Sequence, residues 1–185
     1  MGEPGVKEVL SLESLEAAGS IKTGRKHILS ILVENKPGVL TRVASLFARR
    51  GFNIDTLSVG PTDDEDISRI TITLDGANHP IDQVTKQLHK LVNVLKIRDL
   101  EPTESVAREL AMFKVSVDAS TRDEVRGIVD VFRGRVVDVG RRSLIVELTG
   151  TSAKIGAFEE LLRPFGLIET MRTGEIAIAR GRAET

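Results

Sequence analysis

The sequence predicts an α+β protein built from two tandem units, each with the element order βαββαβ. Runs with the period-2 alternation of strands and runs with the i, i+3, i+4 spacing of helices follow one another in that order over residues 26–101. The same order recurs over residues 108–181. Residues 102–107, which begin Pro-Thr-Glu-Ser, are typical of a linker. Two crossovers of this kind give a four-stranded antiparallel sheet with both helices on one face, the ferredoxin-like fold.

The first unit opens with the apolar run 28–33, which predicts a strand and leads into a Pro-Gly turn at residues 37–38. Gly51 is placed to end the helix that follows. That helix is predicted from apolar residues spaced i, i+3, i+4 and i+7: Leu40, Val43, Ala44 and Phe47. The remaining elements are predicted as a strand over 52–59, an alternating strand over 68–74, a helix that Pro80 opens and a strand over 94–100.

The second unit repeats this order but has no counterpart of the turn at Asn35–Gly38, so a ligand site of that type belongs to the first unit. Residues 1–25 and 182–185 are expected to be terminal tails. Its predicted elements are a strand over 112–117, a helix capped by Ser120 or Thr121, a hairpin of strands 136–139 and 144–148, a helix starting at Thr151 or Ser152, a strand over 166–171 and a short extra strand over 176–178.

Charge and composition narrow the classes of function. The chain has 185 residues, with 26 Lys and Arg against 27 Asp and Glu, so it has no strong field to attract nucleic acid or an anionic membrane. Aromatic residues make up 3%, too few for base-stacking platforms. No apolar run approaches the roughly 20 residues that span a bilayer, and the first residues lack the basic-then-apolar order of a secretory signal. We expect a cytoplasmic protein that binds neither nucleic acid nor membranes.

The sequence contains no motif of a catalytic centre. It has neither a phosphate-binding Gly-x-x-x-x-Gly-Lys-Ser/Thr loop, nor a Gly-x-Gly-x-x-Gly turn, nor a Gly-x-Ser-x-Gly elbow. The three histidines are not spaced as a metal-binding pair, and there is no cysteine. The acidic loop 60–66 lacks the ligand spacing of a calcium loop and is expected to be a solvated hairpin tip. We expect no catalytic residues, no metal and no cofactor in this chain.

The turn between the first strand and the first helix is the candidate site. Gly38 lets a ligand approach the backbone closely, and the first helical N–H groups, around Gly38, Val39 and Leu40, carry the positive end of the helix dipole. Asn35 offers both a donor and an acceptor at the same corner. These residues allow two readings: a helix start capped by Asn35, or a binding site for a small carboxylate.

Residues 32–43 and 46–54 resemble the opening of an ACT domain, and more narrowly that of the small regulatory subunit of acetohydroxyacid synthase (AHAS, acetolactate synthase). The resemblance covers about residues 27–181 and therefore both units. Further segments that carry it are 68–72, 86–94, 108–111 and 131–134.

The resemblance implies a non-catalytic chain that partners a larger catalytic subunit. That subunit uses thiamine diphosphate, Mg²⁺ and FAD to condense pyruvate units. The chain would raise its activity and confer feedback inhibition by a branched-chain amino acid, usually valine but alternatively leucine or isoleucine. Two chains would pair through their ACT domains and bind the effector at that interface. The ligand positions implied are Asn35 and the backbone of Gly38, Val39 and Leu40 from one chain, with Asn53 and Ile54 from the other.

Two other functions are compatible with the predicted fold. The first is a free-standing amino-acid sensor without an enzyme partner, although no DNA-binding segment is visible. The second is a small ferredoxin-like hydrolase of the acylphosphatase kind. Such a hydrolase needs an anion-gripping arginine in the first loop, where this chain has Asn35-Lys36-Pro37-Gly38.

Overall fold

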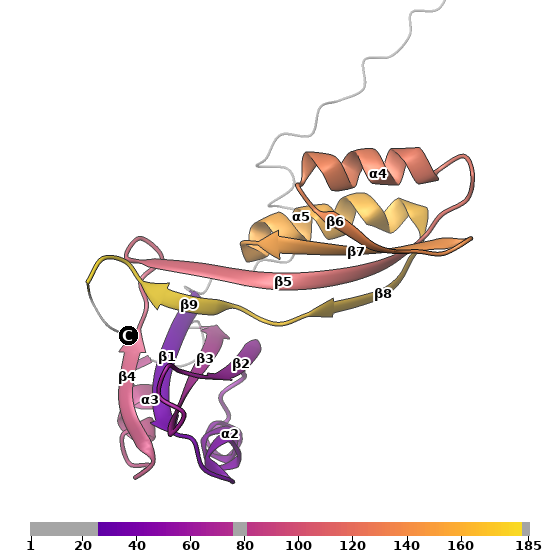
Figure 1. The fold of residues 1–185 in the computed structure, drawn as a ribbon. Helices are drawn as coiled ribbons and strands as arrows, with labels where there is room; N and C mark the ends of the chain where they lie inside the picture. The colour runs from indigo at the N-terminus through magenta and orange to yellow at the C-terminus, as the bar shows by residue number, and fades with distance from the viewer. Residues whose placement is uncertain (1–25, 76–80, 183–185) are drawn as a thin grey trace, which may run out of the picture.

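The computed structural model describes residues 26–75 and 81–182 (Figure 1). The predicted tail 1–25, the predicted helix start at Pro80 and the last residues of the predicted tail 182–185 lie outside the described residues.

The first unit is a four-stranded antiparallel sheet in the order β2-β3-β1-β4. Its elements are β1 (Lys26–Glu34), α2 (Val39–Arg49), β2 (Thr56–Pro61), β3 (Ile67–Asp75), α3 (Ile81–Leu88) and β4 (Val94–Asp99). Alternate residues of β1 and β3, such as the paired Leu29 and Ile72, pack with apolar residues of both helices in one buried core. Both helices therefore cover the same face of the sheet.

The second unit repeats this architecture in the order β6-β7-β5-β8. Figure 1 shows α4 and α5 lying together over one face of its sheet. Its elements are β5 (Ser105–Ser116), α4 (Arg122–Val131), β6 (Arg135–Val139), β7 (Ser143–Gly150), α5 (Ser152–Leu162), the 3₁₀ helix η1 (Arg163–Phe165), β8 (Leu167–Arg172) and β9 (Ile176–Ala179). Phe113 and Phe158 stack edge to face in its core, with ring centroids 5.2 Å apart. The prediction of two ferredoxin-like units is confirmed.

The start of two strands differs from the predicted start by several residues. β5 begins at Ser105, inside the predicted linker 102–107, because its first residues pair with β9 from Ser105–Ala179 to Arg108–Ile176. In the first unit, β2 begins only at Thr56, and the preceding Phe52 and Ile54 pack against the core from a loop rather than from a strand. The short extra strand predicted over 176–178 is present as β9.

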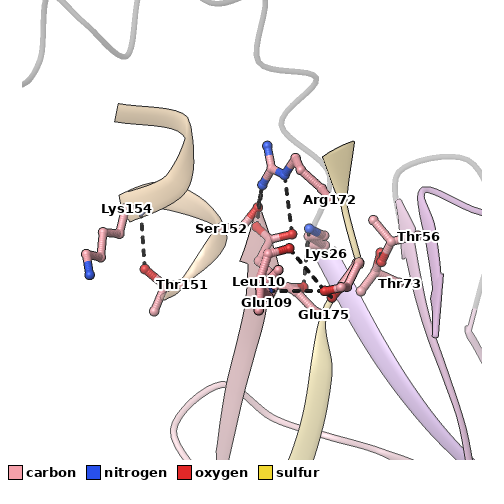
Figure 2. A network of polar contacts seen from close by, with 12 residues as sticks. Lys26, Thr56, Thr73, Glu109, Leu110, Thr151, Ser152, Lys154, Arg172 and Glu175 are labelled. Carbon is pink, nitrogen blue, oxygen red and sulfur yellow. Dashed lines mark hydrogen bonds and ion pairs between the residues drawn. The ribbon is translucent and has the colours of Figure 1, made fainter. Parts of the chain in front are cut away.

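The two units meet where the β5–β9 ribbon lies beside the first sheet. Ala177 of β9 is buried against Ile28 of β1 and Leu100, so a small apolar cluster joins the two larger cores. At the edge of this cluster the Nζ atom of Lys26 lies 3.4 Å from the Glu175 carboxylate. Figure 2 shows this ion pair beside a second one within the C-terminal unit, between Glu109 and Arg172.

Candidate ligand-binding turn

The turn between β1 and α2 is held by its own backbone. The Lys36 N–H donates to the Glu34 carbonyl at 2.9 Å, and the Val39 N–H donates to the Lys36 carbonyl at 3.3 Å. Gly38 is the N-cap of α2 and has φ +82°, a left-handed conformation that glycine adopts without a steric penalty. A Cβ added to Gly38 would meet no atom within 4 Å, so the space above its Cα is open.

Asn35 does not cap the helix, and that reading of the sequence is wrong. The N-cap residue is Gly38, with no side-chain cap. The Asn35 Nδ2 atom instead donates to the Glu65 carbonyl at 2.8 Å, and the Asn35 N–H donates to the Asp66 carbonyl at 2.7 Å. Two bonds thus tie the turn to the loop between β2 and β3, and the Asn35 Oδ1 atom accepts from no donor among the described residues. Nothing local in the sequence indicated that the loop 60–66 supports the turn.

The helix start carries unused donors. Within the part of the chain that the structure describes, the N–H groups of Gly38, Leu40 and Thr41 donate to no acceptor. The Val39 N–H, predicted to share this role, is used by Lys36, and the Val39 side chain is 4% exposed and lies in the core. Leu40 is 42% exposed and stands beside the free donors. The turn therefore combines N–H donors, the positive end of a helix and an apolar side chain.

A polar network surrounds this helix start. The Asn93 side-chain amide and the Lys36 Nζ atom both donate to the Glu34 carboxylate, the latter at 3.2 Å. These two hydrogen bonds, Asn93 first, lower the pKa of Glu34 below its usual value. The Arg42 guanidinium donates to the Asn93 Oδ1 atom at 2.7 Å. In this network the Lys36 charge is offset by Glu34, and the Arg42 guanidinium adds a positive charge near the start of α2.

Asn53 and Ile54 lie at the other end of α2. Asn53 is exposed and its Nδ2 atom donates to the Asp55 carboxylate at 3.2 Å, whereas Ile54 is half-buried against the first core. The eleven-residue α2 helix separates them from the turn by about 16 Å, at 1.5 Å per residue. Within one chain, the structure does not bring these two residues to Asn35 and Gly38.

The described residues offer no metal site and no membrane-spanning helix. In residues 26–75 and 81–182, no three His, Asp or Glu side chains gather closely enough to hold a metal ion. No helix in these ranges is both long and apolar enough to cross a bilayer.

The fold and the turn identify the class of protein, a tandem ferredoxin-like protein whose first unit is an ACT domain. Residues 29–96 match the family described as the AHAS small subunit-like ACT domain, and residues 108–181 match the family described as the small subunit of acetolactate synthase. The chain belongs to the acetolactate synthase small-subunit family.

Three relatives show how close the match is. The chain is 50% identical to the acetolactate synthase small subunit of Mycolicibacterium smegmatis, over 84% of this chain and 91% of that protein. It is 53% identical to the probable acetolactate synthase small subunit of Methanothermobacter thermautotrophicus, over 84% of this chain and 93% of that protein. The crystal structure of the acetolactate synthase small subunit of Thermotoga maritima superposes with a TM-score of 0.80 at 42% identity, over 86% of this chain and 99% of that one. The resemblance seen in the sequence, to a small rather than a catalytic subunit, is confirmed.

Proposed function

We propose that this chain is the non-catalytic regulatory subunit of a cytoplasmic acetohydroxyacid synthase and that the turn before α2 binds a branched-chain amino acid. The observation that carries the proposal is the open helix start. There, the N–H groups of Gly38 and Leu40 have no acceptor among the described residues, and Gly38 leaves the backbone accessible. Membership of the small-subunit family supports this reading over a free-standing sensor or a hydrolase.

Each group of a free amino acid finds a partner type in this arrangement. The carboxylate accepts from the N–H groups at the start of α2, where the helix dipole also favours a negative charge. The Asn35 Oδ1 atom can accept from the ammonium, because the Asn35 Nδ2 atom is already bonded to Glu65. The exposed Leu40 side chain forms one wall for a valine, leucine or isoleucine side chain. Selectivity among these three effectors rests on about one methylene, roughly 1–3 kcal/mol.

The pocket would be completed by a second copy of the chain. Asn53 and Ile54 lie at the opposite end of α2 from Asn35, so they cannot serve the turn of their own chain. A two-fold axis near the middle of α2 would bring the partner's Asn53 and the partner's Ile54 to this turn and create two equivalent sites. The proposed homodimer therefore pairs through the ACT domains.

The two units would have different roles in the complex. Residues 26–101 bind the effector and dimerise, whereas residues 108–181 contribute to contact with the catalytic subunit. We propose that the catalytic subunit carries thiamine diphosphate, Mg²⁺ and FAD, and that the small subunit raises its activity and transmits feedback inhibition. Inhibition requires the effector to favour a less active state of the complex by about 1–3 kcal/mol. The bound catalytic subunit must then change effector affinity by the same factor.

Calorimetric titration of the purified chain with valine, leucine and isoleucine tests this function. We expect saturable binding of at least one of them, weaker binding to the turn in Asn35→Ala and loss of this binding event in Gly38→Asp, in which a carboxylate occupies the anion position. Arg141→Gln, an exposed change in the β6–β7 hairpin, serves as the control. An isotherm of Gly38→Asp that matches the wild type in both affinity and stoichiometry would refute the site. If no effector binds in the presence of the catalytic subunit, the feedback role is refuted as well.

A further inference from the structure

A cavity of about 610 Å³ lies between the two units, away from the turn before α2. Its walls come from β2 and β3 of the first sheet and from the β5–β9 ribbon of the second unit. Arg69 and Thr71 line it and alternate along β3 with the core residues Ile70 and Ile72. They therefore point to the face of the first sheet that α2 and α3 leave uncovered.

Each unit contributes one arginine to the cavity. Arg108 extends from β5, where its Nη1 atom donates to the Ala107 carbonyl at 2.7 Å, and no carboxylate among the described residues pairs with it. Arg69 reaches the cavity from β3, opposite Gly60 of β2. A Cβ added to Gly60 would meet nothing within 4 Å, so the absence of a side chain there keeps the space above Arg69 open. The third charged group of the lining is Asp63, which leaves a net positive charge.

The floor of the cavity is polar and has unused hydrogen-bonding capacity. Ser58 and Thr71 are paired across β2 and β3, and their hydroxyl groups have no partner among the residues that the structure describes. Ser30, the neighbour of Thr71 on β1, is 2% exposed and its Oγ atom also has none. By contrast, the Thr56 and Thr73 hydroxyls, two pairs along the ladder and on the same face, bond each other at 2.6 Å.

The opposite wall is apolar. Ile176 and Ile178 of β9 line the cavity, although they are 58% and 59% exposed. They share one face of the ribbon with their cross-strand partners Arg108 and Val106, and the alanines between them face the first sheet. A ligand with an apolar body would remove part of this exposed surface from water, which is favourable.

We infer that this cavity binds a small monocarboxylate with a short apolar body. The carboxylate would lie between Arg108 and Arg69, its neighbouring polar group on the Ser58–Thr71 floor, and its apolar part against Ile176 and Ile178. Asp63 disfavours polyanions such as phosphates by repulsion. A ligand held by both arginines would connect the two units and fix their relative position, which makes the cavity a second regulatory input, separate from the turn. Both a 2-oxo acid and an amino acid carry this chemistry.

Calorimetric titration of the full chain tests the inference and separates the two sources. The probes are 3-methyl-2-oxobutanoate, valine and the uncharged isobutyramide. We expect the 2-oxo acid, valine or both to bind saturably, and isobutyramide to show no binding. Binding of the oxo acid identifies the 2-oxo acid source, and binding of valine that survives Gly38→Asp identifies the amino-acid source.

Four variants locate the binding. We expect Arg108→Gln to raise the Kd at least tenfold and Gly60→Val to abolish binding by filling the cavity. Arg141→Gln and Gly38→Asp should leave this Kd unchanged, so the cavity can be confirmed even if the turn before α2 binds nothing. Arg108 is exposed, so its replacement tests the site without disturbing the fold. The inference is overturned if no acid binds, if Arg108→Gln and Gly60→Val bind as the wild type does, if isobutyramide binds equally well, or if Gly38→Asp abolishes all binding.

Discussion

Gly174 of the second unit lies against Thr56 of the first unit, and the structure predicts how much its replacement by alanine lowers the free energy of unfolding. This glycine lies between β8 and β9, is buried and has φ +79°. A Cβ built on it would lie 2.9 Å from the Thr56 Cβ atom and 3.2 Å from its Oγ1 atom. Thr56 opens β2 of the first unit, and its hydroxyl is held by Thr73. The clash therefore falls between the units and cannot be relieved by rotating a free side chain.

Two costs add in Gly174→Ala. Placing alanine in the left-handed region costs about 1–2 kcal/mol, and overpacking at the junction costs a further 1–3 kcal/mol or so. Gly51→Ala is the matched control, because Gly51 has φ +72° and a Cβ there would meet nothing within 4 Å. The control carries the first cost without the second.

The assay is urea denaturation followed by far-ultraviolet circular dichroism. We expect Gly174→Ala to lower the free energy of unfolding by about 1–3 kcal/mol more than Gly51→Ala does. The cost should appear in the unit that unfolds first, because its unfolding removes the junction contacts. Equal destabilisation by the two substitutions would refute the reasoning, since it would mean that β9 does not pack on Thr56 as described.

Three further predictions concern other parts of the chain. In the reconstituted enzyme, Gly38→Asp should abolish feedback inhibition by valine while preserving activation, whereas the isosteric, uncharged Gly38→Asn should retain part of it; full inhibition in the aspartate variant would exclude the turn as the effector site. Arg172→Met should destabilise the C-terminal unit by about 3 kcal/mol, because it leaves the Glu109 carboxylate, whose side chain is 1% exposed, without its ion-pair partner. Adding Glu109→Gln to the same chain should recover part of this loss, and no recovery in urea titrations would contradict the pairing. Asp118 accepts hydrogen bonds from Ser120 and Thr121, which lower its pKa from 3.8 to about 2. The stability that the ionised Asp118 contributes is therefore fully present above about pH 4 and is lost as the pH falls through about 2. The Tm difference between wild type and Asp118→Ala should shrink over that range, and a constant difference would refute this prediction.

The sequence predicted those elements whose cause is local. The alternation of residues 68–74 identifies a buried face without knowledge of the partner, and the structure has β3 there. The helix α2 is present where the apolar spacing predicted it, but Leu40, which was included in the predicted stripe, is 42% exposed, and Val39 and Leu46 are buried instead. Thr151 was one of two predicted starts for α5, and its side chain accepts from the Lys154 N–H at 3.3 Å. Such caps can be predicted because donor and acceptor lie within one helical turn.

The features that the sequence did not predict depend on distant residues. β5 extends back to Ser105 because Ala179, at the other end of the C-terminal unit, provides its partner. Asn35 reads as a cap because caps are local, but its side chain bonds a carbonyl of the β2–β3 loop. At the start of α4, Thr121, one of the two predicted caps, is the N-cap, but its side chain makes no cap hydrogen bond. The Asp118 carboxylate instead accepts from the N–H groups of Ser120 and Thr121, just before the helix. The turn thus lies between β1 and α2 as predicted, whereas the contacts that support it come from residues distant in the sequence, and its role as a ligand site stays a prediction.

A ¹⁵N-edited NMR titration of the ¹⁵N-labelled chain with valine tests directly whether the turn before α2 binds the effector. We predict that the amide resonances of Gly38, Leu40 and Thr41 shift in a saturable manner, because these N–H groups gain an acceptor. The resonances of Asn53 and Ile54 should shift with the same Kd, because these residues complete the site of the partner subunit. Saturable shifts elsewhere, with the amides at the start of α2 unchanged, would contradict the claim that this turn is the effector site.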